Sequence, residues 1–165
     1  MLPTLQIVAV LLVAVAMTTA LAYALELPGK MRLPRDTYMA VQQIYYPGFT
    51  IAGFAEFVAI AATLALTVLA VGEGVRFWLM LGAFVAMAAM HLVYWLLTHP
   101  VNGFWLKDVE PEGAGAAFFN ADPLQRGSAA AQDWTILRNR WEWSHVIRAV
   151  LSIVALALLV TAVAL

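Results

Sequence analysis

Histidine, arginine and glutamate side chains inside long apolar stretches are the features of this sequence most able to do chemistry. The ionisable residues that interrupt these stretches are Glu26, Glu56, His91, His99, His145 and Arg148. A charge placed in lipid costs several kcal/mol, so each of these residues needs a partner or a functional role. Histidine titrates near neutral pH and arginine stabilises developing negative charge, so His145 and Arg148 together suit a proton-transfer or oxygenation reaction.

Two metal-based sites are the alternatives. Haem ligation by His91 and His145 requires two imidazoles that face each other at equal depth across neighbouring helices. A Glu/His metal site would use Glu26, Glu56 and the same two histidines, but the Glu-x-x-His repeat typical of di-iron bundles is missing. The chain has no cysteine, which excludes disulfides, thiolate metal sites and cysteine nucleophiles. We therefore expect no metal and no cofactor, and rank haem or metal at His91 and His145 below that expectation.

The spacing of the polar residues places them on single helical faces. In the last apolar run, alternating steps of four and three residues define one stripe along a helix. Its members are Trp134, Arg138, Trp141, His145, Arg148 and Ser152. A second face belongs to the third apolar run, provided that the helix continues through Pro100. Its members are His91, Tyr94, Trp95, Thr98 and Asn102.

Four apolar runs must position these residues, at about residues 3–26, 48–71, 75–98 and 136–165. Each run is long enough to cross about 30 Å of hydrocarbon. Hydrophobic residues make up 64% of the 165 residues and charged residues 12%, whereas a soluble domain carries about 25% charged residues. The sequence therefore predicts an all-α integral membrane protein, a four-helix bundle in a single domain over residues 1–165. Its expected partner is the lipid bilayer, and the sequence is compatible with a homo-oligomer. The net charge of −1 argues against nucleic acid as a partner.

The connections between the runs are of unequal length. No Lys or Arg precedes the first run, so we expect a retained first helix rather than a cleaved signal. Pro28 and Gly29 are expected to end that helix. A short amphipathic helix follows in the prediction, with Asp36 as its N-cap. The connection between the third and fourth helices, about residues 99–133, is long enough to act as a lid.

Because the chain reverses direction after each run, the polar ends of the four helices share one side of the membrane. Glu56 lies eight residues after Gly48, about 12 Å down at about 1.5 Å per residue. His91, His145 and Arg148 fall near that depth, so we expect one cavity beneath the two long connections. The residues expected to bind substrate there are Glu56, His91, His99, Tyr94, Arg138 and Glu26, with Glu26 and His99 nearer the mouth.

Purely structural roles compete with this interpretation. Glu56 and Arg148 would then form an ion pair that fixes the register of two helices. Trp105 and Trp143 are typical of the aromatic belt at the lipid interface. Arg140, near a helix end, is typical of an anchor at the membrane surface.

The positive charges predict an orientation in the membrane. On the side of the long connections they are Lys30, Arg32, Arg35, Lys107, Arg126, Arg138 and Arg140. The opposite side has Arg76 and the terminal amine. The excess of Lys and Arg marks the cytoplasmic side, so we expect both large loops in the cytoplasm and both termini outside.

Four stretches of this chain resemble the small four-helix membrane proteins grouped with anthrone oxygenases. They are residues 24–30 (ALELPGK), 44–48 (IYYPG), 99–105 (HPVNGFW) and 138–149 (RNRWEWSHVIRA). The pattern typical of that group is Pro-x-Asn at the end of the third helix, followed by a Trp/Asn/His/Arg cluster that opens the fourth. Many members are bacterial, so the resemblance implies a bacterial cytoplasmic (inner) membrane.

The resemblance also implies an activity. The characterised fungal members resemble oxygenases that oxidise an anthrone to an anthraquinone without metal or flavin. If the family's site is carried over to this chain, it consists of Asn102, Trp141, His145 and Arg148. His145 would remove a proton from an electron-rich aromatic substrate, Arg148 would stabilise the anion, and Asn102 and Trp141 would donate hydrogen bonds.

Two functions follow as hypotheses. The first is a membrane-embedded oxygenase-like or related redox protein that acts on a lipophilic aromatic or quinone-like small molecule. The second is a non-enzymatic membrane accessory or interaction protein, in which the buried Glu, His and Arg residues are structural. A cavity between the helices favours the first, and its absence favours the second.

Overall fold

The computed structural model describes residues 2–45, 48–105 and 133–165, and all the regular structure in these segments is helical. The elements are α1 (Leu2–Lys30), α2 (Arg35–Gln42), a 3-10 turn η1 (Gln43–Tyr45), α3 (Gly48–Leu69), α4 (Val75–Val93), a π-helix η2 (Tyr94–Thr98), α5 (His99–Trp105) and α7 (Trp134–Ala164). Four helical stretches are long and apolar enough to span a membrane, namely Leu2–Lys30, Ala52–Leu69, Val75–Asn102 and Trp134–Ala164. The prediction of an all-helical chain with four such helices is confirmed.

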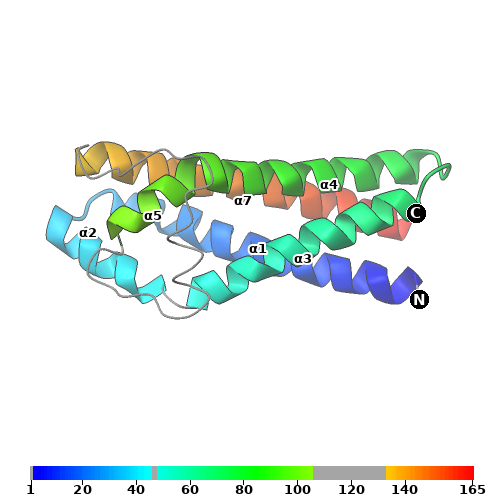
Figure 1. The fold of residues 1–165 in the computed structure, drawn as a ribbon, viewed down its shortest axis with the longest axis horizontal. Helices are drawn as coiled ribbons and strands as arrows, with labels where there is room; N and C mark the ends of the chain where they lie inside the picture. Colours follow the sequence, from blue (N-terminus) through cyan, green and yellow to red (C-terminus); the bar gives the residue numbers. More distant parts are fainter. Residues whose placement is uncertain (1, 46–47, 106–132) are drawn as a thin grey trace.

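The four long helices lie side by side (Figure 1). α1 packs against α3 and α7, and α4 packs against the same two helices. The chain termini and the turn between α3 and α4 lie at one end, and α2, α5 and the start of α7 lie at the other, here called the loop end (Figure 1). The tight turn depends on Gly72 and Gly74, whose φ angles of +89° and +63° are strained for other residues. The predicted long connection lies outside the described residues.

Small residues let the helices approach closely in the half of the molecule away from the loop end. Ala9, Val13, Ala16 and Ala20 recur along one face of α1 and are almost completely buried. They share a core with residues of α4 and α7, including Ala83, Ala155 and Ala162. Lipid tails give no hydrophobic drive for helix association, so close packing of small side chains must supply the contact energy. Large apolar side chains such as Ile7, Leu11 and Val150 instead face outward, as lipid contact requires.

Helix α1 continues one turn beyond the predicted end, so the prediction that Pro28 and Gly29 stop it is wrong. Pro28 lies inside the last turn, where it removes one backbone hydrogen bond. The turn is held instead by Lys30, whose ammonium is buried and lies 2.9 Å from the Glu26 carboxylate one turn earlier. A cation at this position also complements the negative end of the helix dipole.

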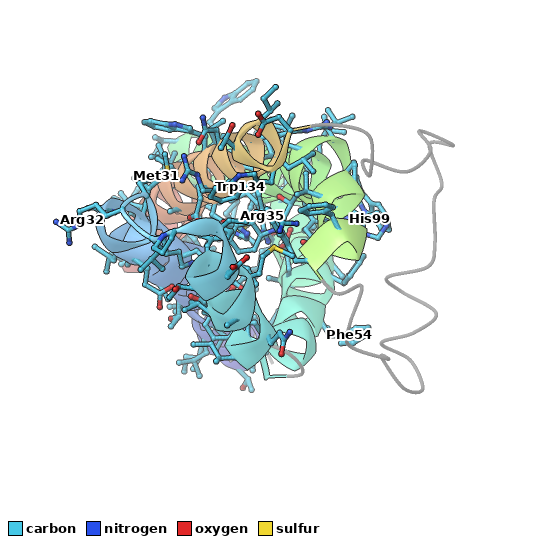
Figure 2. All side chains as sticks on the ribbon, turned by 90° about the vertical axis from the view of Figure 1, so that its left-hand side faces the viewer. Met31, Arg32, Arg35, Phe54, His99 and Trp134 are labelled. Atoms are coloured by element: carbon cyan, nitrogen blue, oxygen red, sulfur yellow. The ribbon has the colours of Figure 1, made fainter. Side chains whose placement is uncertain are left out.

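Helix α2 covers the loop end of the molecule. Viewed from that end, it crosses in front of the long helices, with Arg32 projecting to one side and His99 and Phe54 on the other (Figure 2). Tyr38 and Gln42, four residues apart on α2, are buried. Pro34 occupies the N-cap position, so Asp36 lies in the first turn and does not cap the helix as predicted.

The third membrane-length helix passes through Pro100 by changing to π geometry over Tyr94–Thr98 and continuing as α5. Proline has no N–H to donate to the Leu96 carbonyl four residues earlier. Arg140 on α7 supplies a donor, because its Nη2 lies 2.7 Å from the Leu96 carbonyl oxygen. Arg140 is thus partly buried and bonded to a neighbouring helix, so it is more than the predicted surface anchor.

Candidate functional site

A cavity lies between the helices near the loop end. About 870 Å³ between its side chains is not filled by atoms, the open mouth included. That is room for a small molecule rather than one water, whose share of liquid volume is about 30 Å³. Phe54 and Phe57 of α3 line the cavity and are 45% and 40% exposed, so it reaches the outer surface of that helix.

Seven of the ten predicted site residues line this cavity. They are Glu56 from α3, His91 from α4, Tyr94 from η2, Asn102 from α5, and Trp141, His145 and Arg148 from α7. The side chains come from three of the four membrane-length helices, as the stripes in the sequence predict. The aromatic residues Tyr23, Tyr45 and Phe49 complete much of the wall.

A buried ion pair forms the deep part of the cavity. Arg148 Nη2 lies 2.7 Å from Glu56 Oε2, and the two side chains are 8% and 5% exposed. Glu56 Oε1 also lies 3.1 Å from His91 Nδ1. Trp95 Nε1 donates a hydrogen bond to His91 Nε2 at 2.8 Å. Since Nε2 accepts, the imidazole proton is on Nδ1 and is donated to Glu56.

His145 has the opposite tautomer. Arg148 Nη1 lies 3.3 Å from His145 Nδ1, and a guanidinium can only donate, so Nδ1 accepts. The imidazole proton is therefore on Nε2, which is buried and has no hydrogen-bond partner among the described residues. This tautomer makes Nε2 of His145 a hydrogen-bond donor, whereas the resemblance implies a base.

Asn102 is oriented by a second set of hydrogen bonds. Trp141 Nε1 donates to Asn102 Oδ1 at 2.8 Å, and Asn102 Nδ2 lies 3.4 Å from the Tyr94 hydroxyl. The Tyr94 hydroxyl in turn lies 3.1 Å from His99 Nδ1. Trp141 therefore donates to Asn102 and is not free to donate to a ligand.

Aromatic rings enclose the His145 imidazole. The Tyr23 ring lies over it with centroids 4.1 Å apart, and the Trp141 ring meets it edge-on at 4.3 Å. The Arg148 guanidinium lies 5.3 Å from the centroid of the Tyr94 ring. Aromatic rings thus pack against His145 and Arg148, so the cavity wall around these polar groups is largely apolar.

Three predicted site residues lie outside the cavity wall. Glu26 is 42% exposed, pairs with Lys30 and accepts a hydrogen bond from Tyr45. His99 is buried beside Tyr94, and Arg138 lies over the Trp134 ring at 5.0 Å from its centroid. These residues surround the loop end without contributing to the cavity surface.

A second charged cluster adjoins the cavity and was missed in the sequence. The Lys30 ammonium lies 4.5–5.2 Å from the ring centroids of Tyr23, Tyr45 and Trp141. It also lies 3.7 Å from a carboxylate oxygen of Glu142, which is fully buried. The prediction counted Lys30 among the positive charges of the first connection, because nothing in its local sequence shows that aromatic rings enclose it.

Tyr38 connects this cluster to α2. Its hydroxyl donates a hydrogen bond of 2.8 Å to Glu142 Oε1. Burial and the neighbouring Glu142 carboxylate raise the pKa of Tyr38 well above its usual range. Burial and Glu26 similarly raise the pKa of Tyr45, so both phenols remain protonated donors at any physiological pH.

Gln42 and Trp105 are among the ten cavity-lining residues that the sequence did not predict for the site. Gln42 of α2 is 4% exposed, and Trp105 of α5 is 3% exposed rather than at the lipid interface as predicted. Trp143, by contrast, is 57% exposed, as the aromatic-belt prediction requires. The side-chain polar atoms of Gln42 and Trp105 have no partner within the described segments.

Two observations bear on the metal alternatives. Across residues 2–45, 48–105 and 133–165, no group of three or more His, Cys, Asp or Glu side chains could hold a metal ion. Both ring nitrogens of His91 are engaged, one by Glu56 and one by Trp95, so His91 has no free lone pair for haem iron.

Comparisons of the chain with family models, with curated proteins and with solved structures find no match. The function is therefore argued from the geometry of the cavity.

Proposed function

We propose that this protein is a membrane-embedded oxygenase-like or related redox enzyme that acts on a lipophilic aromatic or quinone-like molecule. The observation that carries the proposal is the cavity itself, where aromatic walls meet a buried Arg148–Glu56 pair and the Nε2–H of His145. Ligand sites are mostly apolar pockets with a few converging polar groups, and this cavity has that composition. Its opening beside Phe54 and Phe57, on an outward face of α3, suits a ligand that arrives from the bilayer.

The reaction proposed is the oxidation of a methylene group between two aromatic rings to a carbonyl by O₂. The carbon loses two hydrogens and gains one oxygen atom, and the second oxygen atom leaves with those hydrogens as water. The ligand class has a carbonyl conjugated with this carbon, as in an anthrone, so the first step, loss of a proton, gives an enolate that donates electrons to O₂. An electron-rich enolate is a good reductant, so the demand on the protein is to stabilise it in an apolar site.

The side chains have distinct roles in this step. His145 Nε2–H donates a hydrogen bond to the enolate oxygen, and the positive charge of Arg148 stabilises the same oxygen. Glu56 is the carboxylate among the described cavity-lining residues, and its oxygens keep lone pairs beyond those used by Arg148 and His91. It is the proposed proton acceptor. Asn102, held by Trp141, positions the Tyr94 hydroxyl beside them.

The experiment is oxygen consumption by the purified protein in detergent with 1,8-dihydroxyanthrone as the probe. We expect turnover above the protein-free rate, and a loss of about 100-fold or more in Arg148→Gln and His145→Ala. Arg138→Gln is the matched control, since it removes a guanidinium from the same helix outside the cavity. A protein that neither consumes oxygen nor binds the anthrone contradicts the proposal.

A non-enzymatic accessory or interaction protein is the second candidate, favoured by the buried Glu56–Arg148 ion pair as a structural element. The double variant Glu56→Arg with Arg148→Glu distinguishes the two. If the pair is only structural, the swap restores stability lost in each single variant and leaves the protein fully functional in cells. If the site is catalytic, the swap restores stability but not oxygen consumption, because the cation and the carboxylate have changed places.

For the location, we propose a bacterial cytoplasmic (inner) membrane with the loop end in the cytoplasm and both termini outside. Arg32 and Arg35 at the loop end support this orientation, with Arg35 56% exposed. Lys30 and Arg140 contribute less to the argument than the sequence suggested, because both are engaged inside the fold. Self-association as a homo-oligomer stays a prediction.

A further inference from the structure

We propose that the loop end of the cavity is a second polar subsite, formed by Gln42 and Trp105, that binds a hydroxyl oxygen carried by the lipophilic ligand. The inference rests on the proposed function for the class of ligand. It adds where that ligand carries its second polar group and which side chains recognise it.

The first argument is the state of the two side chains. Gln42 ends α2 and Trp105 ends α5, both line the cavity, and they are 4% and 3% exposed. Gln42 Nε2, Gln42 Oε1 and Trp105 Nε1 are buried without a hydrogen-bond partner in the described part of the chain. Leaving a buried polar group unpaired costs about 1–3 kcal/mol, so three such atoms together need an explanation. Binding of a polar ligand group provides one.

The second argument is which hydrogen bonds the side chains of Gln42 and Trp105 can form. Trp105 Nε1 and Gln42 Nε2 are donors, and Gln42 Oε1 is an acceptor. A ligand hydroxyl can accept from the two donors and donate to the acceptor, whereas a carbonyl leaves Gln42 Oε1 unpaired. Both side chains are neutral, so they provide no countercharge for a carboxylate. A neutral hydroxyl is therefore the best match.

The third argument is where the subsite lies relative to His145. Trp105 contacts the Trp141 ring at 6.4 Å between centroids, and Trp141 contacts the His145 ring at 4.3 Å. Trp105 also packs on Tyr38, one turn before Gln42 on α2, with centroids 5.3 Å apart. The Trp141 ring thus separates the two polar ends. A flat aromatic ligand that lies along Trp141 has one oxygen at His145 and a hydroxyl at Gln42 and Trp105.

The experiment compares two near-isosteric probes, 2-(hydroxymethyl)anthraquinone and 2-methylanthraquinone, by equilibrium dialysis in detergent after correction for micelle partition. We expect the wild-type protein to prefer the hydroxymethyl compound by about 5- to 10-fold, the worth of one or two net hydrogen bonds. Gln42→Leu and Trp105→Phe should bring that preference close to one. Gln43→Leu, at the adjacent exposed position of the chain, and Trp143→Phe, at an exposed position of α7, are the matched controls and should keep the full preference.

Thermal unfolding of the ligand-free variants supplies a second readout. An apolar side chain relieves an unpaired buried amide, so Gln42→Leu should leave the melting temperature unchanged or raise it. A marked fall would show that Gln42 supports the fold, and would overturn the subsite. Equal binding of the two probes to the wild-type protein would also overturn it and leave the proposed function standing. Failure of both probes to bind would reject the ligand class, and with it both proposals.

Discussion

At the residue scale, the Glu56–Arg148 pair makes the stability of the protein depend on the same groups that define the cavity. Each charge is almost completely removed from water, and each is compensated chiefly by the other. A buried pair of this kind adds little net stability, but removing one partner leaves an uncompensated charge in an apolar site. A substitution at Glu56 therefore lowers the stability of the protein, whatever its effect on a reaction in the cavity.

Glu56→Gln should lower the free energy of unfolding by about 3–5 kcal/mol, because the buried Arg148 guanidinium loses its countercharge. Thermal or denaturant unfolding in detergent measures the loss. Adding Arg148→Met should recover part of it, since the double variant no longer buries an unpaired charge.

Glu73→Gln is the matched control for this change. Glu73 also pairs with an arginine, Arg76, at 2.9 Å, but the two side chains are 40% and 30% exposed. An exposed pair contributes about 0–1 kcal/mol, so the control should unfold almost like the wild type. Equal losses in Glu56→Gln and Glu73→Gln would mean that water reaches the cavity pair freely.

Residue types and spacing were enough to find the charged and histidine side chains among the described residues that line this cavity, but not the hydrogen-bonding state of these groups. His145 and Arg148 are three residues apart on one apolar helix, which predicts a shared face. The tautomer of His145 depends on where the Arg148 guanidinium lies after Glu56 has bound it, and Glu56 is 92 residues away in the sequence. Gln42 and Trp105 were missed because their burial arises from how α2 and α5 fold over the loop end.

At the element scale, the π-helix η2 and Arg140 together allow the third long helix to continue through Pro100. The proline cannot donate to the Leu96 carbonyl, and Arg140 Nη2 donates to it at 2.7 Å. Thr98, in the same segment, lies 2.8 Å from the Ser144 hydroxyl of α7. These two bonds tie η2 to α7 and fix the position of α5 above the cavity.

Arg140→Met should destabilise the protein by about 1–3 kcal/mol, because the Leu96 carbonyl loses a donor in a buried setting. Pro100→Ala restores a backbone N–H at the position where an α-helix would bond that carbonyl. The double variant should therefore lose less stability than the sum of the two single variants, as measured in a double-mutant cycle. Arg138→Met, whose partner is the adjacent Asn139, should change stability by no more than about 0.5 kcal/mol.

The long helices and the starts of α3 and α4 were predictable, because apolar length decides them, but the end of α1 was not. The long runs of α3 and α4 begin at residues 48 and 75, as predicted, because glycine and charge interrupt the apolar sequence there. Helix α1 continues past Pro28 and Gly29 because Lys30 pairs with Glu26 and packs against three aromatic rings. These contacts exist only in the folded protein. Local stop signals were outweighed by tertiary packing at that end.

At the scale of the whole molecule, the fold separates a packed half from a half that holds the cavity. Alanine-rich faces fill the space between the helices toward the termini, and aromatic and charged side chains surround the cavity at the loop end. The orientation of this asymmetry in the membrane decides which compartment supplies the protons and water that the proposed reaction exchanges.

The absence of native cysteine makes that orientation directly measurable. Asp36→Cys places a thiol at the loop end, where the native side chain is 97% exposed, and Glu73→Cys places one at the opposite end. With the loop end in the cytoplasm, a membrane-impermeant maleimide should label Glu73→Cys on intact bacterial spheroplasts and Asp36→Cys only after permeabilisation. The reverse pattern would contradict the proposed topology.

The π-helix also has a consequence for how this cavity could be reshaped. A π-helix has hydrogen bonds between residues five apart instead of four, so it holds one extra residue. Every side chain after η2 therefore points about 100° away from the direction that it would have if α4 continued as a regular α-helix. Removing a single codon, that of Leu97, would return the segment to regular α geometry. Asn102 and Trp105 would keep their places on the cavity wall, because the deletion removes the one residue that η2 absorbs, and the span would stay helical by circular dichroism. A one-residue deletion within α4, with η2 intact, would instead rotate both side chains by about 100° away from the cavity wall, so the position of a length change decides whether the ligand site survives it.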